Sequence, residues 1–167
     1  QKPLTRDDYM AADYLAWPFR GVDATTSTDG GRAVIITTAD RAKELNNPLV
    51  TIRGFGVSND TSKGWQLTPG DPVSSAAVAG RMAFEMAGLA PKDIGGAQIY
   101  DCYTYTVEAT LADYGFYDPN KSRDFMNVDN IGPGGDFPLN TGGGLLAEGY
   151  YMGMTPVAEA VMQMSGR

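Results

Sequence analysis

The chain has 167 residues, of which 43% are hydrophobic and 20% are charged, an ordinary balance for one globular domain with a hydrophobic core. Its formal net charge of −7 disfavours nucleic acid and anionic membrane surfaces as partners, because both attract basic surfaces. The chain contains no histidine, so it cannot by itself supply a Ser-His-Asp triad, a Cys-His dyad or a histidine-ligated zinc.

The single cysteine, Cys102, excludes a disulfide within the chain and is compatible with a reducing cytosol. No apolar run approaches the roughly 20 residues of a membrane span, and the polar first residues do not resemble a signal peptide. The chain begins without methionine and stops within a helical pattern at residues 161–167. We therefore expect a fragment, or the ordered part, of a longer protein.

The first third of the chain is expected to alternate short helices with strands. Residues 5–16 mix apolar side chains with carboxylates and predict a short helix. A glycine-bearing turn at 27–32 precedes the run 33–38, whose continuous apolar, β-branched residues are typical of a strand buried on both faces. Residues 39–45 predict a brief helix, and the alternating run 49–57 predicts a second strand.

A polar loop at 59–72 precedes a helix that is expected at 76–87. Ser74 or Ser75 suits its N-cap, because a hydroxyl accepts a hydrogen bond from a free backbone amide in the first helical turn. Gly88 suits its C-terminal end, where a left-handed backbone is favoured. Three apolar residues recur every four positions and predict the buried stripe of this helix: Val78, Met82 and Met86.

The remaining elements complete an alternating pattern. A third strand is expected at 96–100 and a helix at 103–114, with Val107, Leu111 and Tyr114 on one face. Residues 117–140 are rich in Asp, Asn, Gly and Pro without periodicity, which indicates a functional loop rather than a packed element. A last helix is expected to open at 140–144 and to run through Met164. Strands that alternate with helices predict an α/β layer sandwich.

Polar and aromatic residues crowd the point where the third strand gives way to a helix. Tyr100, Asp101 and Cys102 lie there, and α/β proteins place their sites where free amides at a helix N-terminus hold anions. The alternative is that Asp101 or Thr104 caps the helix and that the tyrosines only pack. Without a histidine to act as base, Cys102 is interpreted as a buried, inert thiol.

Two glycine-rich runs are the other candidates. Asn140 and Thr141 precede three glycines, Gly142–Gly144, which would allow the backbone to approach a ligand closely. This run lacks the Lys-Ser/Thr pair of a P-loop and the spacing of a dinucleotide fingerprint, so a tight start of a helix is the alternative. Asp29, Gly30 and Gly31 are interpreted as a turn that leads into a strand.

Taken in order, these motifs resemble those of the thiolase superfamily. Asp29–Ala33 resembles the DGA motif that closes the first half of a thiolase, and Ala87–Ile94 resembles the AGL…DI motif before the third strand. Tyr100–Tyr103 occupies the place of the thiolase NEAF motif, which reads HDCF in sterol-carrier-type thiolases. Asn140–Tyr150 occupies the place of the N-x-x-GG…GHP motif.

The resemblance implies a thiolase-like layered αβαβα sandwich, represented mainly by its second half. Residues 1–48 would be the end of the first half, and residues 49–167 would be the second half without its final hairpin. The first-half unit that carries the thiolase nucleophilic cysteine is not in this sequence.

The departures from the thiolase pattern point to one branch. Tyr100 and Tyr150 stand where sterol-carrier-type thiolases have histidines that help to form the oxyanion hole. The run Ala147–Met154 is similar to the SEAYIHGM of the lipid-transfer-protein branch, which includes aldolases that remove CoA-thioester side chains from steroids with two tyrosines. The resemblance implies that Tyr100 and Tyr150 are catalytic. It also implies a supporting set: Asp101, Asn140, Gly142, Gly143 and Gly144.

The function implied is retro-aldol cleavage of a β-hydroxyacyl-CoA with a steroid or lipid side chain. The alternatives are an acetyl-CoA acyltransferase whose nucleophilic cysteine lies outside this chain, and a non-catalytic scaffold subunit. CoA would enter as part of the substrate, with no other cofactor or metal in this chain. The resemblance further implies a cytoplasmic homodimer that pairs with a small OB-fold and zinc-ribbon protein, which would carry any zinc.

Overall fold

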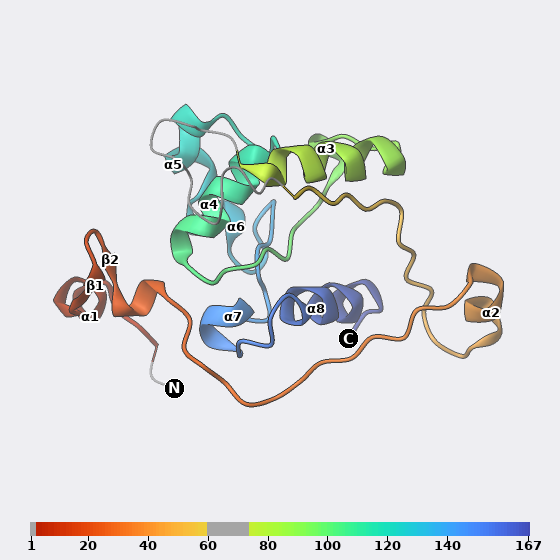
Figure 1. Cartoon of the computed structure of the whole chain (residues 1–167), viewed down its shortest axis with the longest axis horizontal. Helices are drawn as coiled ribbons and strands as arrows, with labels where there is room; N and C mark the ends of the chain where they lie inside the picture. Colours follow the sequence, from red (N-terminus) through yellow and green to blue (C-terminus); the bar gives the residue numbers. More distant parts are fainter. Residues whose placement is uncertain (1–2, 60–73) are drawn as a thin grey trace.

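A computed structural model of the protein describes residues 3–59 and 74–167 (Figure 1). The polar loop expected at 59–72 lies, apart from its first residue, outside the described residues. The α-helices are α1 (Arg6–Ala11), α2 (Ala39–Glu44), α3 (Ser75–Ala87), α4 (Thr104–Asp113), α5 (Ser122–Phe125), α6 (Val128–Ile131), α7 (Gly144–Ala147) and α8 (Met154–Met164). The short 3₁₀-helices are η1 (Gly21–Asp23), η2 (Pro91–Asp93) and η3 (Pro119–Lys121).

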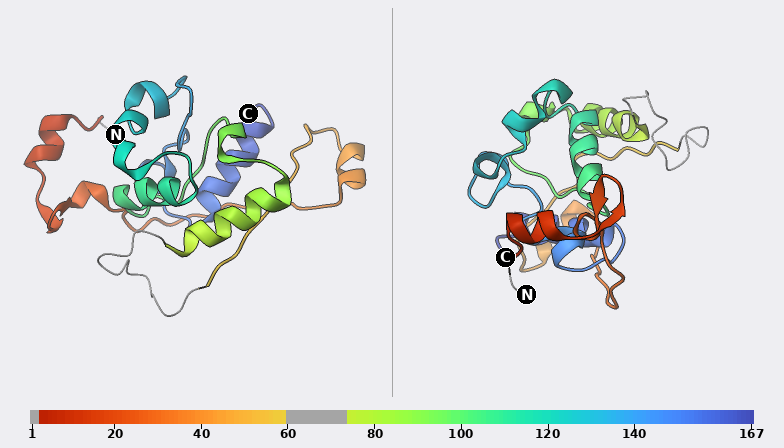
Figure 2. Two further views of the ribbon diagram at one scale, coloured as in Figure 1. Left: turned by 90° about the horizontal axis from the view of Figure 1, so that it is seen from above. Right: turned by 90° about the vertical axis from the view of Figure 1, so that its left-hand side faces the viewer.

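The N-terminal helix is shorter than expected, because half of the predicted segment forms a hairpin. Thr5 caps α1: its hydroxyl accepts a hydrogen bond from the Asp8 amide at 3.1 Å, and the Asp8 carboxylate accepts one from the Thr5 amide at 3.1 Å. After α1, β1 (Tyr14–Ala16) pairs antiparallel with β2 (Phe19–Arg20). The views in Figure 2 place this hairpin at one end of the molecule and α2 at the other.

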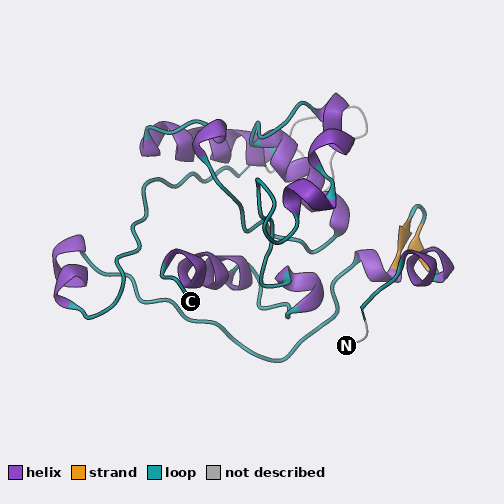
Figure 3. Ribbon diagram, turned by 180° about the vertical axis from the view of Figure 1, so that it is seen from behind, coloured by secondary structure: helices purple, strands orange, loops and turns teal. Residues whose placement is uncertain are grey.

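The three expected strands do not form a sheet among the described residues, where β1 and β2 are the only paired strands. Residues 33–38 and 49–57 are extended but have no strand partner there, as the loop colouring of Figure 3 shows. Ile35 is 94% exposed, so its run is not buried on both faces as predicted. Of the third strand, Ala97 alone forms a bridge, parallel to Leu139. Local β-propensity sets an extended path, but a strand also needs a neighbour to bond.

The core gathers around α4 and confirms its predicted inner face. Val107 and Leu111 are buried, Leu111 completely, and Tyr114 packs against the same cluster. Ile99 and Phe137 complete the cluster, so the end of the expected third strand lies directly on the core.

Residues 117–140 are not an unpacked loop, and that interpretation was wrong. The segment contains η3, α5 and α6 and contributes Phe125 and Phe137 to the aromatic core, with ring centroids 5.2 Å apart. Phe116 packs on Phe137 at 4.8 Å. These aromatic contacts, rather than helical periodicity, stabilise the segment.

Helix α3 begins and ends as predicted but turns a different face inward. The Ser74 hydroxyl accepts a hydrogen bond from the Ala76 amide at 3.1 Å, and Gly88 ends the helix with a φ of 66°. The predicted stripe is wrong: its members Val78, Met82 and Met86 are all exposed. The face toward α4 instead carries small and aromatic residues, with Gly80 against the Tyr114 ring and Phe84 edge-on to Phe116.

The prediction of one continuous helix from residues 140–144 through Met164 is wrong, because the structure has two helices there. Helix α7 ends at Ala147 and α8 begins at Met154, and the turn between them carries Tyr150 and Tyr151. Met152 in this turn has a φ of 53°, a left-handed conformation that interrupts any continuous helix. No helix in the described part of the chain is both long and apolar enough to cross a membrane.

Asp23 joins α1 and the β1–β2 hairpin to the start of α4. Its carboxylate, in a residue only 3% exposed, accepts hydrogen bonds from the Arg20 amide at 2.7 Å, the Tyr9 hydroxyl at 3.0 Å and the Thr104 hydroxyl at 2.9 Å. Burial raises the pKa of Asp23, but the hydrogen bonds from Arg20, Thr104 and Tyr9 outweigh it and hold the pKa below its ordinary value.

We expect the Asp23→Asn substitution to lower stability and to reduce its acid dependence. A carboxyl whose pKa is lower in the folded state contributes stability above its unfolded pKa of about 3.9, and this contribution is lost as the pH falls through the folded value. The variant should lose about 1–3 kcal/mol at pH 7 and show a smaller further loss on acidification. Urea unfolding between about pH 7 and pH 2.5 measures both effects. The exposed Asp136→Asn is the control; equal losses in the two variants would contradict the assignment.

Candidate functional site

The segment that carries Tyr100 is held by a short parallel pairing with the segment before the glycine run. The Ala97 amide donates to the Pro138 carbonyl at 3.0 Å, and the Asn140 amide donates to the Ala97 carbonyl at 3.0 Å. Two residues later Ile99 is buried in the core. Tyr100 therefore follows a segment that is held both by backbone hydrogen bonds and by a side chain in the core.

The Asn140 side chain extends this pairing beyond the last backbone bond. Its Oδ1 accepts a hydrogen bond from the Ile99 amide at 2.7 Å, and its Nδ2 donates to the Ile99 carbonyl at 3.0 Å. One amide group thus satisfies both polar groups of a residue whose side chain is buried. Asn140 itself has a φ of 47°, a left-handed conformation that asparagine tolerates better than most residues.

Asp101 joins the same segment to the glycine run. Its carboxylate, in a residue 3% exposed, accepts hydrogen bonds from the Leu145 amide at 2.8 Å and the Leu146 amide at 3.3 Å. It therefore caps α7, and the interpretation that it caps the helix directly after it is wrong. The hydroxyl of Thr104 instead bonds Asp23.

The three glycines make a tight start of α7, which was one of the two interpretations of this run. Gly144 has a φ of 60°, and a Cβ there would lie 2.7 Å from the Asp101 Cγ. Gly143 has a φ of 97°, and a Cβ on Gly142 would lie 2.7 Å from the Glu159 carboxyl group. Gly143 and Gly144 are favoured by their left-handed backbone conformations, and the close approach at Gly144 brings α7 onto Asp101.

The two candidate tyrosines meet, although 50 positions separate them in the chain. The Tyr100 hydroxyl donates a hydrogen bond to the Tyr150 hydroxyl at 2.8 Å, and the rings lie edge to face with centroids 6.2 Å apart. Tyr150 reaches this place from the turn between α7 and α8. The structure therefore brings Tyr100, Tyr150, Asp101, Asn140 and the glycine run into one cluster.

The protonation state of Tyr100 is set by its surroundings. Burial, followed by the hydrogen bond to Tyr150, raises the pKa of the Tyr100 phenol well above its ordinary value of about 10. The phenol is therefore a hydrogen-bond donor at neutral pH.

Cys102 lies beside the pair and is half-buried, not buried as predicted. Its Sγ is 3.8 Å from the Thr106 hydroxyl, which donates to the Tyr103 carbonyl at 2.7 Å. Among the described residues, no group of three or more Cys, Asp or Glu side chains is close enough to hold a metal ion.

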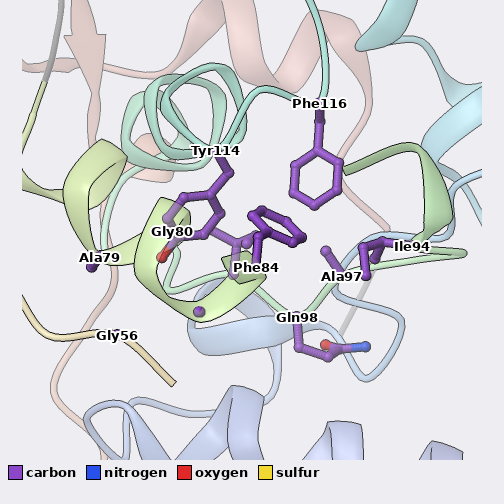
Figure 4. Close-up of a pocket in the computed structure, with 11 residues that line it drawn as sticks. Gly56, Ala79, Gly80, Phe84, Ile94, Ala97, Gln98, Tyr114 and Phe116 are labelled. Carbon is purple, nitrogen blue, oxygen red and sulfur yellow. The ribbon is translucent and has the colours of Figure 1, made fainter. Parts of the chain in front are cut away.

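A separate apolar cavity of about 260 Å³ lies between α3 and residues 94–99 (Figure 4). The rings of Phe84, Tyr114 and Phe116 surround it, and Gln98 lies at its edge. Sequence reasoning missed it, although the small residues of α3 were a signal for a close approach. Neither Tyr100 nor Tyr150 lines this cavity.

The chain resembles known proteins along nearly its whole length. A family model described as thiolase C-terminal domain-like matches residues 58–167. A 17-hydroxy-3-oxo-4-pregnene-20-carboxyl-CoA lyase from Mycobacterium tuberculosis is 34% identical over 99% of the chain. A steroid side-chain-cleaving aldolase from Thermomonospora curvata is 31% identical over 99% of the chain, and an acetyl-CoA acetyltransferase from Methanothermobacter thermautotrophicus is 29% identical over 98%.

The shape agrees with these matches. A solved Ltp2-ChsH2(DUF35) aldolase superposes with a TM-score of 0.90 at 29% identity over 99% of the chain. With the family match, this superposition confirms the expected α/β, thiolase-like fold. The chain spans 44% of that structure's chain and 44% of the lyase and the steroid aldolase.

We expect Asn140→Asp to destabilise the cluster although the two side chains have the same shape. The substitution replaces the amide donor to the Ile99 carbonyl with a carboxylate oxygen, which leaves that carbonyl without its partner. The free energy of unfolding should fall by about 1–3 kcal/mol, measured by urea unfolding. Asn47→Asp on the exposed surface should change it by less than about 0.5 kcal/mol, and equal effects would contradict the role assigned to the amide.

Proposed function

The chain belongs to the thiolase C-terminal domain-like family, and on that premise we propose that it carries the tyrosine pair of an enzyme that cleaves β-hydroxyacyl-CoA thioesters by a retro-aldol reaction. The observation that carries the proposal is the 2.8 Å hydrogen bond between the Tyr100 and Tyr150 hydroxyls. These residues occupy the positions of the histidines in the motifs of sterol-carrier-type thiolases. Because the chain spans only 44% of its aldolase relatives, the proposal concerns the part of the site that this chain supplies.

The reaction needs two kinds of group and no covalent intermediate. A base removes the proton of the β-hydroxyl, and the O–H electron pair becomes the second bond of a ketone. The bond between the α and β carbons breaks, and its electrons move onto the thioester as an enolate. The proton is returned to the α carbon, which yields a shortened acyl-CoA. A hydrogen-bond donor at the thioester oxygen stabilises the charge that develops there.

The environment of the two phenols distinguishes their roles. The raised pKa of Tyr100 keeps this phenol protonated, so its hydroxyl, which otherwise donates to Tyr150, can turn to donate to the thioester oxygen as the enolate forms. Tyr150, whose oxygen accepts the Tyr100 hydrogen bond, then takes the proton of the substrate hydroxyl while its own phenolic proton passes to the α carbon, so that the residue is neutral before and after the reaction. Asp101 and Asn140 act as positioning residues, because they hold the backbone on either side of Tyr100 to the glycine run.

The substrate class follows from the relatives. Two of them, at 31% and 34% identity, are named for steroid side-chain cleavage and for a steroid carboxyl-CoA lyase. We therefore assign a steroid or lipid CoA thioester with a β-hydroxyl as the substrate. CoA enters as part of this substrate and no further cofactor is assigned to the chain.

The partners are proposed on the same basis. The structurally similar aldolase is a complex of Ltp2 with ChsH2(DUF35). This chain would accordingly act with a second protein. The family resemblance implies that this partner is of the OB-fold and zinc-ribbon kind and that the assembly is a cytoplasmic homodimer.

Acyl transfer is the second candidate, because an acetyl-CoA acetyltransferase is 29% identical over 98% of the chain. That reaction requires a nucleophilic cysteine, which would lie outside this chain. A non-catalytic scaffold, with the tyrosines only packed, is the remaining alternative.

We expect Tyr100→Phe and Tyr150→Phe each to reduce cleavage of 17-hydroxy-3-oxo-4-pregnene-20-carboxyl-CoA strongly while the protein stays folded. Removal of an oxyanion donor costs about 2.7–4 kcal/mol, or about 100- to 1,000-fold in kcat. Turnover is followed by release of the shortened acyl-CoA, and folding by circular dichroism. The exposed Tyr103→Phe, three residues along, is the control and should keep near-normal turnover. Near-normal activity of either site variant would contradict the proposal.

Aldol cleavage and acyl transfer differ in whether the protein becomes acylated. The retro-aldol route leaves no covalent adduct, whereas a thiolase accumulates an acyl-cysteine. Intact-mass spectra taken during turnover by the full-length protein that contains this chain should therefore show no adduct. An added acyl mass would favour the acyltransferase. The scaffold would be favoured if there is no turnover and if the chain binds a partner protein tightly in a way that neither Tyr→Phe change affects.

A further inference from the structure

Residues 23–32, hereafter the strap, contact both segments that carry the paired tyrosines. At the first segment, the Thr25 amide donates to the Cys102 carbonyl at 3.1 Å, and Ala24 forms an antiparallel bridge with Tyr103. Asp23 adds its hydrogen bond from Thr104. The beginning of the strap is therefore bonded to the backbone directly after Tyr100.

The rest of the strap reaches the turn that carries Tyr150, and Figure 1 shows this segment passing from η1 beneath α7. The Tyr150 amide donates to the Thr28 hydroxyl at 3.3 Å, and this hydroxyl donates to the Thr26 carbonyl at 3.3 Å. The Arg32 guanidinium forms an ion pair with Glu148 and lies 5.5 Å from the centre of the Tyr151 ring. One continuous stretch of chain thus bridges two segments that are far apart in sequence.

Gly30 is the closest point of this contact. A Cβ added there would lie 2.7 Å from Cζ of the Tyr151 ring and closer still to its Cε1. On its other side the same ring touches Gly149, where a Cβ would lie 2.8 Å from the Tyr151 hydroxyl. The Thr155 hydroxyl, in a residue that is almost fully buried, donates to the Gly149 carbonyl at 2.9 Å. The Tyr151 ring therefore lies against two glycines, and the turn that carries it is tied to α8.

We infer that the strap sets the position of Tyr150 relative to Tyr100, and that Gly30 is its positioning residue because a Cβ at this position would displace the Tyr151 ring. The inference rests on the proposed function for its consequence in catalysis, but the geometry itself does not depend on it. A turn that leads into a strand does not explain Gly30, because the following run, 33–38, pairs with no described strand.

The test compares two adjacent glycines with the same substitution. Gly30→Ala forces the Tyr151 ring to move, whereas the added methyl of Gly31→Ala meets no atom within 4 Å. Both variants are prepared with tyrosine labelled by carbon-13 at Cζ, and the signals of Tyr100 and Tyr150 are assigned from their Phe variants. Gly30→Ala should shift both signals, and Gly31→Ala should leave both in place.

The kinetic readout connects the geometry with the reaction. A misplaced Tyr150 should lower kcat by about 10- to 100-fold with little change in KM, because substrate binding is intact and only the reacting geometry changes. Shifted signals with unchanged kcat would support the inference that the strap positions Tyr150, and would contradict the role of the tyrosines in catalysis. Unshifted signals in Gly30→Ala would overturn the inference that the strap positions Tyr150, whatever the Tyr→Phe variants show.

A second pair of variants tests the strap if Gly30→Ala does not fold. Thr28→Val removes the hydroxyl that accepts the Tyr150 amide hydrogen bond, and Thr28→Ser keeps it. The Val variant should shift the Tyr150 signal and lower kcat, and the Ser variant should restore both. If the Val and Ser variants behave alike, the positioning role of the strap is contradicted.

Discussion

The structure around the two tyrosines depends on the junction between residues 97–101 and the segment that follows Phe137. A single backbone bridge at Ala97 would hold this junction weakly. The Asn140 amide and the Asp101 carboxylate extend it on either side of Tyr100, one by pairing with Ile99 and the other by capping α7. Because Ile99 is buried in the core, these polar bonds attach the candidate site directly to the hydrophobic core.

The extended runs show that a chain can follow a strand-like path without strand pairing. Residues 49–57 have no strand partner among the described residues, yet the chain superposes on a related aldolase with a TM-score of 0.90. Their path is set by packing on α3, since a Cβ on Gly56 would lie 2.8 Å from the Ala79 carbonyl carbon, and one on Gly54 would lie 3.0 Å from the Ala87 amide. Close backbone approach replaces hydrogen bonds here as the constraint on the path.

Without histidine, the proposed acid–base chemistry falls to tyrosine, whose ordinary pKa of about 10 lies far from neutrality. A half-buried tyrosine pair suits this requirement when one phenol is kept firmly protonated, as desolvation and the Tyr150 contact do for Tyr100. The pair is also sensitive to small displacements, because a hydrogen bond weakens steeply as its atoms separate. The bonds that Asp101, Asn140 and the strap make to the surrounding backbone limit such displacements.

The sequence by itself determined what depends on neighbouring residues. Helices at 39–44, 75–87 and 104–113 lie within one residue of their expected ends, because caps, glycines and helical spacing act locally. The family motifs also indicated Tyr100 and Tyr150 as candidate catalytic residues, and the structure brings their hydroxyls together.

Only the tertiary structure decided what depends on residues distant in the chain. It turned α3 so that Met82 and Met86 face outward, packed Phe125 and Phe137 into the core, and made Asp101 the cap of α7 rather than of the next helix. It also placed Gly30 against Tyr151. In each case the deciding contact joins segments that sequence spacing does not relate, so no local pattern could have specified it.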